Sequence, residues 1–398
     1  RRLRYVKFHY RMDFLKLKFA KRTFVLSFLF AWNVALTAYI NSTFLGNVLS
    51  AELIGFVFAL GAILTLIGLE WIPNLLKKEG NVRTTSLLIL LSVASLLGLH
   101  MSETLPIGMI VFLFVIYNST NSLVAYCFDL FFEHFSHKET VGRERGLYLT
   151  VTNFAWLLAP LLSGFLISNA GFTFLYGIVG IIVSITGIIV VTGFKNFVDP
   201  NYDNVPVFKL LFSFDRERNI LHIITINFLL QVFYAWMVVY TPLYLSQELG
   251  LSFGAIGIIF TIMLLPFVLI QFPLGWFADK LWGEKELLVI GFIIIAGSTL
   301  LIPYVPNKLF FLGGILFLTR VGASMIEVMS ETYFFKKVNE KEPKVLSLYR
   351  LMTPVAFILG PISGGLIIHY FGFEPLFAIL ASLLLIGIIL SLRLHDTK

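Results

Sequence analysis

The sequence predicts an all-α integral membrane protein with twelve transmembrane helices, and three observations support this fold class. Of the 398 residues, 58% are hydrophobic and only 13% are charged, which leaves too little polar surface to cover a water-soluble globule. The apolar residues form long runs, whereas soluble helices interleave them with charges. Because one span needs about 20 apolar residues and a short connection, a chain of this length holds roughly twelve spans.

The apolar runs between charge and turn clusters predict six helices in each half of the chain. The first six lie near 23–45, 50–76, 83–101, 105–134, 145–168 and 172–194, and the second six near 219–247, 253–278, 285–303, 307–335, 344–370 and 374–394. The longest internal polar stretch, 195–218, separates the two sets. We therefore divide the chain into a basic N-terminal segment (1–22), a first six-helix bundle (23–194), a linker (195–218) and a second six-helix bundle (219–398).

The distribution of basic residues predicts the orientation. Nearly all of the 30 lysines and arginines fall on one side of this topology, and segment 1–22 is on that side. Positively charged loops are retained in the cytoplasm, so we expect cytoplasmic termini in a multi-pass protein of the plasma membrane or a bacterial inner membrane. The net charge of +7 then reflects topology and attraction to anionic lipid, and we expect no nucleic-acid partner.

The two halves resemble each other when they are aligned at a shift of about 200 residues, which indicates an internal repeat. The matched residues include Gly55 with Gly257, Ala125 with Ala323, Asp129 with Glu327, Glu133 with Glu331, Pro160 with Pro361, and Gly164 with Gly365. Proline and glycine at these positions indicate kinks and close helix packing. Duplication of a six-helix unit is the simplest explanation.

One loop motif, between the eighth and ninth predicted helices, adds a family resemblance. Gly275, Asp279, Lys280, Gly283 and Lys285 look like the signature loop of the major facilitator superfamily, in which glycine and an Asp-Arg/Lys pair precede glycine and further basic residues. The spacing departs by one residue before Gly283. The chain thus resembles this family of twelve-helix transporters, in which two bundles alternate access to a central cavity.

The corresponding stretch of the first half matches the signature only in part. It keeps Lys77, Gly80 and Arg83 but has Ile72 and Leu76 where glycine and aspartate are expected. The first copy of the motif is therefore degraded, and whether both bundles latch in the same way is left open.

The signature loop is compatible with a cytoplasmic gate. The carboxylate of Asp279 is suited to accept hydrogen bonds from free amides at a helix N-terminus, and the family resemblance implies the eleventh helix. Lys280 would pair with an acid such as Glu331, and Glu133 and Arg350 are further gate candidates. The alternative is a loop that only fixes orientation.

Charged residues inside spans are costly, so each needs a partner, water or a function. Arg320, Ser324, Glu327 and Glu331 lie on one stripe of the tenth helix, and Asn118, Ser122, Asp129 and Glu133 repeat the stripe on the fourth. The resemblance implies that these two helices line the cavity. Arg320 is then a candidate site for an anionic solute, and the alternative is a structural ion pair.

Two acids are candidates for proton coupling. Asp129 and Glu327 are the deeper members of their pairs, and removal from water favours the protonated carboxyl. The alternative, which we favour from sequence, is pairing with basic residues as gate elements.

Neutral polar residues complete the candidate substrate site. They are Asn33 and Thr37 on the first helix, Asn118 on the fourth, and Asn227, Gln231 and Tyr234 on the seventh. Such groups orient solutes by hydrogen bonds, but they also hold helices together, and the sequence leaves both roles open.

The sequence also lacks several catalytic motifs. It contains no phosphate-binding loop and no Gly-x-Ser-x-Gly elbow, so we expect no ATP hydrolysis, enzyme activity or cofactor. Glu133, His134 and His137 form the densest cluster of potential metal ligands, but they fall beside a basic loop, and we expect no metal site.

These observations predict a monomeric secondary transporter of a small polar or anionic organic solute, coupled to protons. A proton-coupled exporter of lipophilic compounds is the alternative, because Gly360, Pro361, Gly364 and Gly365 look like a Gly-Pro-x-x-Gly-Gly pattern of exporters. That pattern belongs to the fifth helix in exporters and lies in the eleventh here, which weakens the case for export. A polytopic membrane enzyme is the alternative from a different class.

Overall fold

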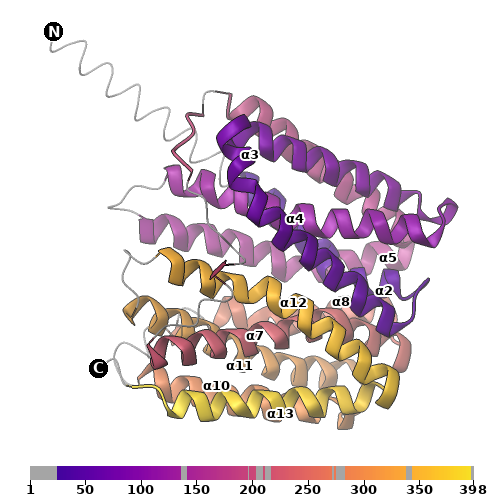
Figure 1. The fold of residues 1–398 in the computed structure, drawn as a ribbon. Coiled ribbons are helices and arrows are strands. Elements are labelled where there is room, and N and C mark those ends of the chain that lie inside the picture. Colours follow the sequence, from indigo (N-terminus) through magenta and orange to yellow (C-terminus); the bar gives the residue numbers. More distant parts are fainter. Residues whose placement is uncertain are drawn as a thin grey trace.

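The computed structural model describes residues 25–135, 141–195, 197–202, 209–210, 217–270, 273–274, 283–337 and 343–395. Regular structure within these ranges is entirely helical (Figure 1). The elements are a helix at Val25–Ala38, α2 (Asn41–Leu45), α3 (Ala51–His100), η1 (Ser102–Thr104), α4 (Ile107–Phe135), α5 (Val141–Gly193), α7 (Arg218–Leu243), η2 (Tyr244–Glu248), α8 (Phe253–Leu269), α10 (Glu284–Leu301), η3 (Ile302–Tyr304), α11 (Leu309–Lys337), α12 (Pro343–Phe371) and α13 (Phe373–Leu392).

Eight of the described helices are long and apolar enough to cross a membrane, and the helices Val25–Ala38 and α8 are shorter apolar segments. Two of the eight, α3 and α5, have 50 and 53 residues, far more than the about 20 that one crossing needs. Each is interrupted by a glycine with non-helical backbone angles, Gly80 in α3 and Gly171 in α5. Figure 1 shows α3 turning back on itself.

The internal repeat is visible in the backbone at two glycines. Gly171 has φ 80° and ψ 176°, and Gly372, which precedes α13, has φ 83° and ψ −175°. Glycine adopts such positive φ values at little cost, whereas side chains disfavour them. The two positions correspond in the sequence repeat, so the duplication extends to the shape of this turn.

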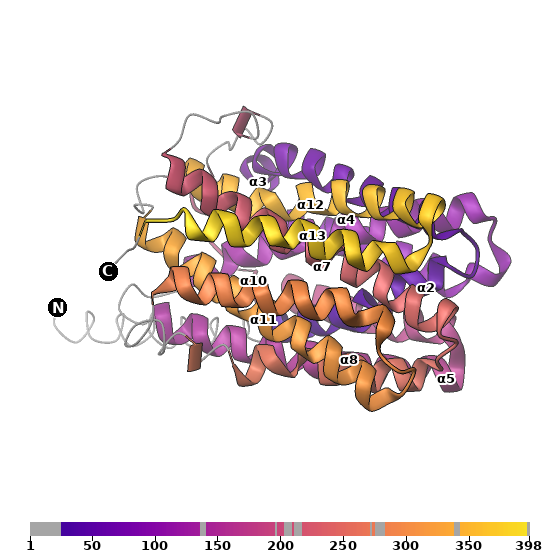
Figure 2. The same ribbon diagram turned by 90° about the horizontal axis from the view of Figure 1, so that it is seen from below.

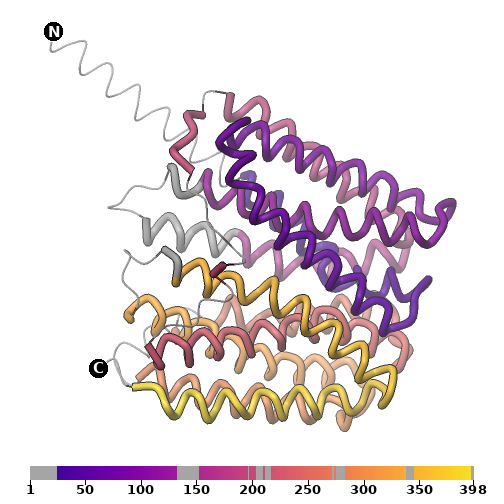
Figure 3. Tube along the Cα trace, viewed as in Figure 1, coloured from indigo at the N-terminus to yellow at the C-terminus, as the bar shows by residue number. Residues whose placement is uncertain are grey.

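The helices gather in two groups that follow the order of the chain. Those up to Gly193 form one side of the molecule and those from Arg218 onward form the other (Figures 1 and 3). The halves meet where α3 contacts α12 and where α5 contacts α8. We call the end of the molecule with Gly80 and Arg218 the linker end, and the end with Gly171 and Gly372 the far end. The helices run between these ends, as the second view shows (Figure 2).

The outer surface is apolar, as expected for a protein surrounded by lipid. Leu90, Phe112, Phe165, Ile181 and Ile188 are each more than half exposed. Contiguous exposure of this kind is rare in soluble monomers but is expected where acyl chains are the solvent. The chain is therefore an integral, multi-pass membrane protein.

An acidic residue that follows α5 returns to the break in α3. Asp199 Oδ1 accepts hydrogen bonds from the backbone N–H of Asn81 (2.7 Å) and from the hydroxyl of Tyr202 (2.6 Å). A carboxylate at the start of a helix satisfies a free amide and is favoured by the helix dipole. Burial, followed by the hydrogen bond to Asp199 and its negative charge, raises the pKa of Tyr202, so this phenol remains a donor. The start of the linker is thereby attached to the first half.

Helices α10 and α11 pack backbone to backbone at Gly322, which gives a test of the fold. A Cβ at this position would lie 2.7 Å from both Gly291 O and Ile295 N. We expect Gly322→Ala to lower the free energy of unfolding by about 1–3 kcal/mol, because backbone atoms have no room to move aside. The measurement is the thermal unfolding midpoint of the detergent-purified protein.

Gly314→Ala, on the same helix, is the matched control. No atom lies within 4 Å of a Cβ at Gly314, and alanine favours helix by up to about 1 kcal/mol, so the midpoint is expected to stay or rise. Equal midpoints for the two variants would contradict the described crossing of α10 and α11.

Candidate functional site

A cavity of about 630 Å³ lies between the two halves. Its lining residues are Ala62, Thr65, Leu69 and Pro73 on α3; Asn118, Ser122, Ala125, Tyr126, Asp129 and Leu130 on α4; and Ser347, Arg350, Leu351, Thr353, Pro354 and Phe357 on α12. The α3 and α4 residues belong to the first half and the α12 residues to the second. The volume suits a small organic solute, since ligand pockets commonly measure about 300–1,000 Å³.

Two charged side chains line this cavity from opposite halves. Asp129, predicted as a proton-coupling residue, and Arg350, predicted as a gate residue, are both exposed. Arg350 makes no ion pair with any side chain that the structure describes. Both lie toward the linker end, because α4 ends and α12 begins there. The cavity thus presents a cation from the second half opposite an acid from the first.

Toward the far end the two halves pack closely at two helix crossings that occupy matching places in the repeat. In the first, α3 meets α12 where Gly55 lies against the Pro361 carbonyl, which also accepts a hydrogen bond from Tyr240. In the second, α8 meets α5, and a Cβ on Gly257 would lie 3.3 Å from Gly164 Cα. The same Cβ would lie 2.5 Å from Pro160 O. The close packing predicted from these glycines and prolines is confirmed.

An aromatic contact also joins the halves. The ring of Tyr39, just after the first described helix, lies 4.9 Å from Phe260 of α8 and 6.4 Å from Trp156 of α5. Tyr39 and Phe260 are both buried. Together with the two glycine crossings, this cluster packs the two halves against each other in the part of the molecule toward the far end.

Arg320 is fully buried in the second half. None of its three side-chain nitrogens has a hydrogen-bond partner among the described residues. Its guanidinium lies over the rings of Phe233 (5.0 Å) and Tyr234 (5.7 Å), and such cation–π contacts offset part of the cost of burial. It does not line the cavity, so its assignment to the substrate site remains a prediction.

Glu327 lies two turns along the same helix and contacts the same tyrosine. The hydroxyl of Tyr234 donates to Glu327 Oε2 at 3.0 Å. Tyr234 therefore touches both the buried cation, through its ring, and the acid, through its hydroxyl. Glu331, one turn further, is exposed.

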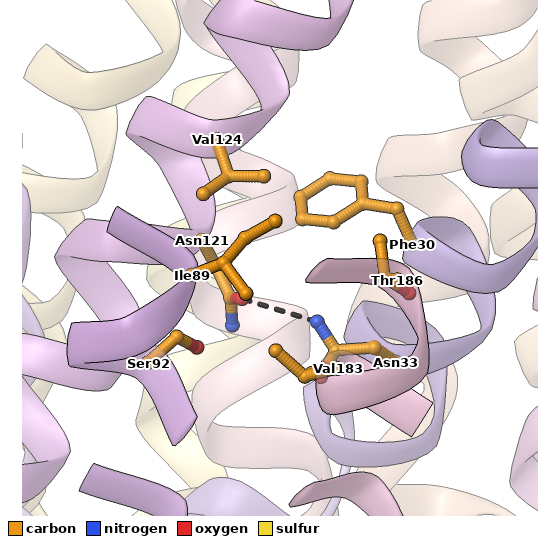
Figure 4. A pocket seen from close by; sticks show the side chains of 8 residues that line it. All are labelled: Phe30, Asn33, Ile89, Ser92, Asn121, Val124, Val183 and Thr186. Atoms are coloured by element: carbon orange, nitrogen blue, oxygen red, sulfur yellow. Dashed lines mark hydrogen bonds between the residues drawn. The ribbon is translucent and has the colours of Figure 1, made fainter. Parts of the chain in front are cut away.

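Asn33 and Thr37, predicted to face the cavity, form a hydrogen-bonded network inside the first half instead. Asn33 Nδ2 donates to Asn121 Oδ1 at 3.1 Å (Figure 4), and Tyr117 donates to Asn33 Oδ1 at 3.0 Å. The hydroxyls of Thr37 and Tyr117 lie 3.0 Å apart. The interhelical alternative thus describes these contacts, whereas a role in substrate binding stays a prediction.

A small cavity of about 10 Å³ borders this network (Figure 4). Ser92, on its wall, is buried and its hydroxyl has no partner among the described residues. Sequence reasoning missed Tyr117 and Asn121, although their spacing of four residues places them on one face of α4.

The polar residues of the seventh predicted helix make hydrogen bonds within α7 and to α12. Asn227 donates to the backbone carbonyl of Tyr349 at 3.0 Å, and Gln231 donates to Asn227 Oδ1 at 3.4 Å. They tie α7 to α12. Among the seven candidate substrate residues, Asn118 is the one that lines the large cavity.

The predicted latch falls largely outside the described part of the chain. Gly275, Asp279 and Lys280 lie beyond it, and the side chains of Glu133 and His134 are likewise not described, nor is His137. At the linker end the structure instead shows an ion pair between Lys336 and the buried Glu284. It joins α10 to α11 within one half. Sequence analysis missed this pair, although an acid in the first helical turn after Gly283 was a signal for it.

Among the residues that the structure describes, no group of three or more His, Cys, Asp or Glu side chains is placed to hold a metal ion. The single cysteine, Cys127, is a buried free thiol.

The crossing at Gly257 yields a conformational test. We expect Gly257→Ala to force α8 away from α5 and so to open the far end, because the new methyl group would meet a backbone carbonyl. Thr43 is 4% exposed and borders this crossing, so a Thr43→Cys probe reports the opening. Its labelling by a membrane-impermeant maleimide should rise by at least about fivefold.

Gly254→Ala is the control for this test, since its Cβ would meet only the Ser168 hydroxyl, at 3.5 Å. Unchanged labelling in Gly257→Ala, or an equal rise in Gly254→Ala, would show that the crossing does not close the far end.

Comparisons with known proteins agree with this architecture. Residues 223–398 match the family model described as Major Facilitator Superfamily. A Bacillus subtilis (strain 168) protein, "Uncharacterized MFS-type transporter YwoD", is 25% identical over 148 residues, which are 37% of this chain and 32% of that relative. The match thus spans about a third of the curated relative.

Solved structures are similar over nearly the whole chain. The nucleoside transporter NupG (D323A mutant) has a TM-score of 0.73 at 11% identity, and it covers 96% of this chain and 100% of its own. A second NupG structure has a TM-score of 0.72 at 13% identity, with the same coverage. At these identities the likeness shows the fold alone. The second half of the chain thus matches the major facilitator superfamily model, and the chain as a whole shares the fold of these transporter structures.

Proposed function

We propose that this protein is a secondary active transporter of a small polar or anionic organic solute, which it moves by alternating access. The observation that carries the proposal is the cavity of about 630 Å³ that both halves line and that the far-end crossings leave closed on one side. A site bounded by two similar bundles is reached from either side when the bundles rock against each other. The described state would then be open at the linker end.

The topology that we propose has twelve crossings with both termini in the cytoplasm. The interruptions at Gly80 and Gly171 divide α3 and α5 into two rods each, which supports the count of six helices in the first half. The basic residues cluster toward the linker end in the sequence, which supports a cytoplasmic linker end. Transport by a single chain, without a second subunit, is part of the same proposal.

The preference for an anionic group rests on two arginines. Arg350 stands in the cavity with no ion pair to a described side chain, and Arg320 is buried with three nitrogens lacking hydrogen bonds within the described chain. A guanidinium offers a fixed fork of donors that matches a carboxylate or phosphate. Solute would meet Arg350 first and Arg320 once Tyr234 moves off its guanidinium.

The transport test uses purified protein in liposomes and a defined panel of probes: labelled lactate, succinate, glutamate, uridine and tetraphenylphosphonium. Uridine is included because the similar structures are of a nucleoside transporter by name, and tetraphenylphosphonium represents the lipophilic exporter alternative. We expect uptake of an organic acid, reduced about ten- to a hundredfold by Arg320→Ala and partly kept by Arg320→Lys, as for loss of a charge-assisted bond.

Arg83→Ala is the matched control, because Arg83 is 78% exposed at the linker end and pairs, among the described side chains, with Glu79 across the break at Gly80. Unimpaired uptake in Arg320→Ala protein would remove Arg320 from the site. Transport of tetraphenylphosphonium, with no uptake of the acids or uridine, would favour the exporter.

We also propose that Glu327 couples transport to protons, since it is held by Tyr234 beside the buried Arg320. Glu327→Gln mimics a protonated carboxyl, so we expect accumulation driven by a pH gradient to fall by about tenfold or more while solute exchange at equal pH continues. Glu331→Gln, one turn away and exposed, should keep the gradient dependence. Wild-type uptake that ignores the gradient would exclude proton coupling.

A further inference from the structure

An ionisable pair bridges the two halves at the far end, where α3 begins and α12 ends. Glu52 Oε1 lies 3.4 Å from His369 Nδ1, and the two side chains are 29% and 52% exposed. The contact belongs to the α3–α12 crossing, because a Cβ on Gly365 would lie 3.0 Å from the Glu52 backbone. Both groups are therefore held at the boundary between the halves and remain open to protons from the surrounding water.

The other far-end crossing lacks this pair. At the matching place, where α8 begins and α5 runs past it, Gly254 faces the hydroxyl of Ser168. The two crossings share their glycine and proline contacts, so packing alone does not require an acid and a histidine at one of them. Because the two crossings are otherwise alike, the acid and the histidine at one of them indicate a function beyond helix packing.

Two tyrosines lie beside the pair. Tyr240 of α7 approaches from the same crossing, with its hydroxyl 3.2 Å from a Cβ on Gly365. Tyr370, on α12, stacks edge-on against His369 with ring centroids 4.9 Å apart. Histidine is the side chain that ordinarily gains or loses its charge between about pH 5 and pH 8.

We propose that Glu52 and His369 form a proton-binding site at the far end that holds the two halves together when His369 is charged. At low pH the imidazolium pairs with the carboxylate, and this pair exists only while the far end is closed. At high pH the imidazole is neutral, the attraction is lost, and the far end opens more readily. The pair lies at the far end and is separate from Glu327 of α11, the acid proposed for coupling. Its effect does not depend on which solute the cavity binds.

The test measures the far end directly and needs no transported solute. Spin labels are attached to Met101→Cys and Tyr304→Cys, which replace exposed residues at the far-end tips of opposite halves; the native thiol, Cys127, is buried. Distance distributions in nanodiscs are compared at about pH 5.5 and about pH 8.5. We expect the ratio of short to long distances to be about two- to fivefold higher at the acid pH, as for an exposed ion pair.

Three variants and a control decide the outcome. His369→Gln and Glu52→Gln should each make the distance distribution independent of pH, and His369→Lys should hold the closed form across the range. His100→Gln is the matched control, because His100 also lies toward the far end but contacts the Thr173 carbonyl within the first half. A wild-type distribution that does not change with pH, or a pH response that survives in His369→Gln, would overturn the proposal.

Discussion

The structure depends on the approach of backbones without intervening side chains. At two crossings, helices from different halves approach backbone to backbone because a glycine leaves space for a carbonyl, and Gly55 and Gly257 do so at corresponding places. Because small residues let membrane helices pack closely, the two halves approach tightly at these two crossings, beside the aromatic contact of Tyr39 with Phe260. The two glycine crossings can separate without the withdrawal of an interlocked side chain. The contact that joins the halves at the far end is therefore also one that the two halves can break at a low cost in free energy.

The buried arginine imposes the second constraint. A guanidinium without hydrogen bonds in a low-dielectric interior is destabilising unless other groups compensate, and here two aromatic rings lie beneath it. Tyr234 then has two tasks, because its hydroxyl is bound to Glu327. Any movement of this tyrosine alters the surroundings of a cation and an acid at once. Sequence alone places Arg320 and Glu327 on one helix and Tyr234 on another. It does not show that Tyr234 contacts both of the other two.

The sequence predicted the features that depend on composition and periodicity. The all-helical membrane fold is confirmed, the family resemblance is confirmed over residues 223–398, and so is the close packing at Pro160, Gly164 and Pro361. The sequence could not decide which polar residues line the cavity and which join helices, because Asn33 and Asn118 have the same polarity and differ only in the direction that they face. That direction depends on helix rotation, which tertiary packing sets. The Asp199 contact was equally hidden, because it joins residues 118 positions apart.

Asp199 changes where the connection between the halves effectively begins. Asp199 and Tyr202 belong structurally to the first half, because the Asp199 carboxylate caps the rod that follows Gly80 and accepts a hydrogen bond from Tyr202. In a gene cut into two separately expressed fragments, a cut before residue 199 would leave that rod uncapped and would move the acid to the wrong fragment. A cut beyond Tyr202 would keep the acid with the helix it caps. The structural unit of the first half thus includes the start of the segment that composition alone assigns to the linker.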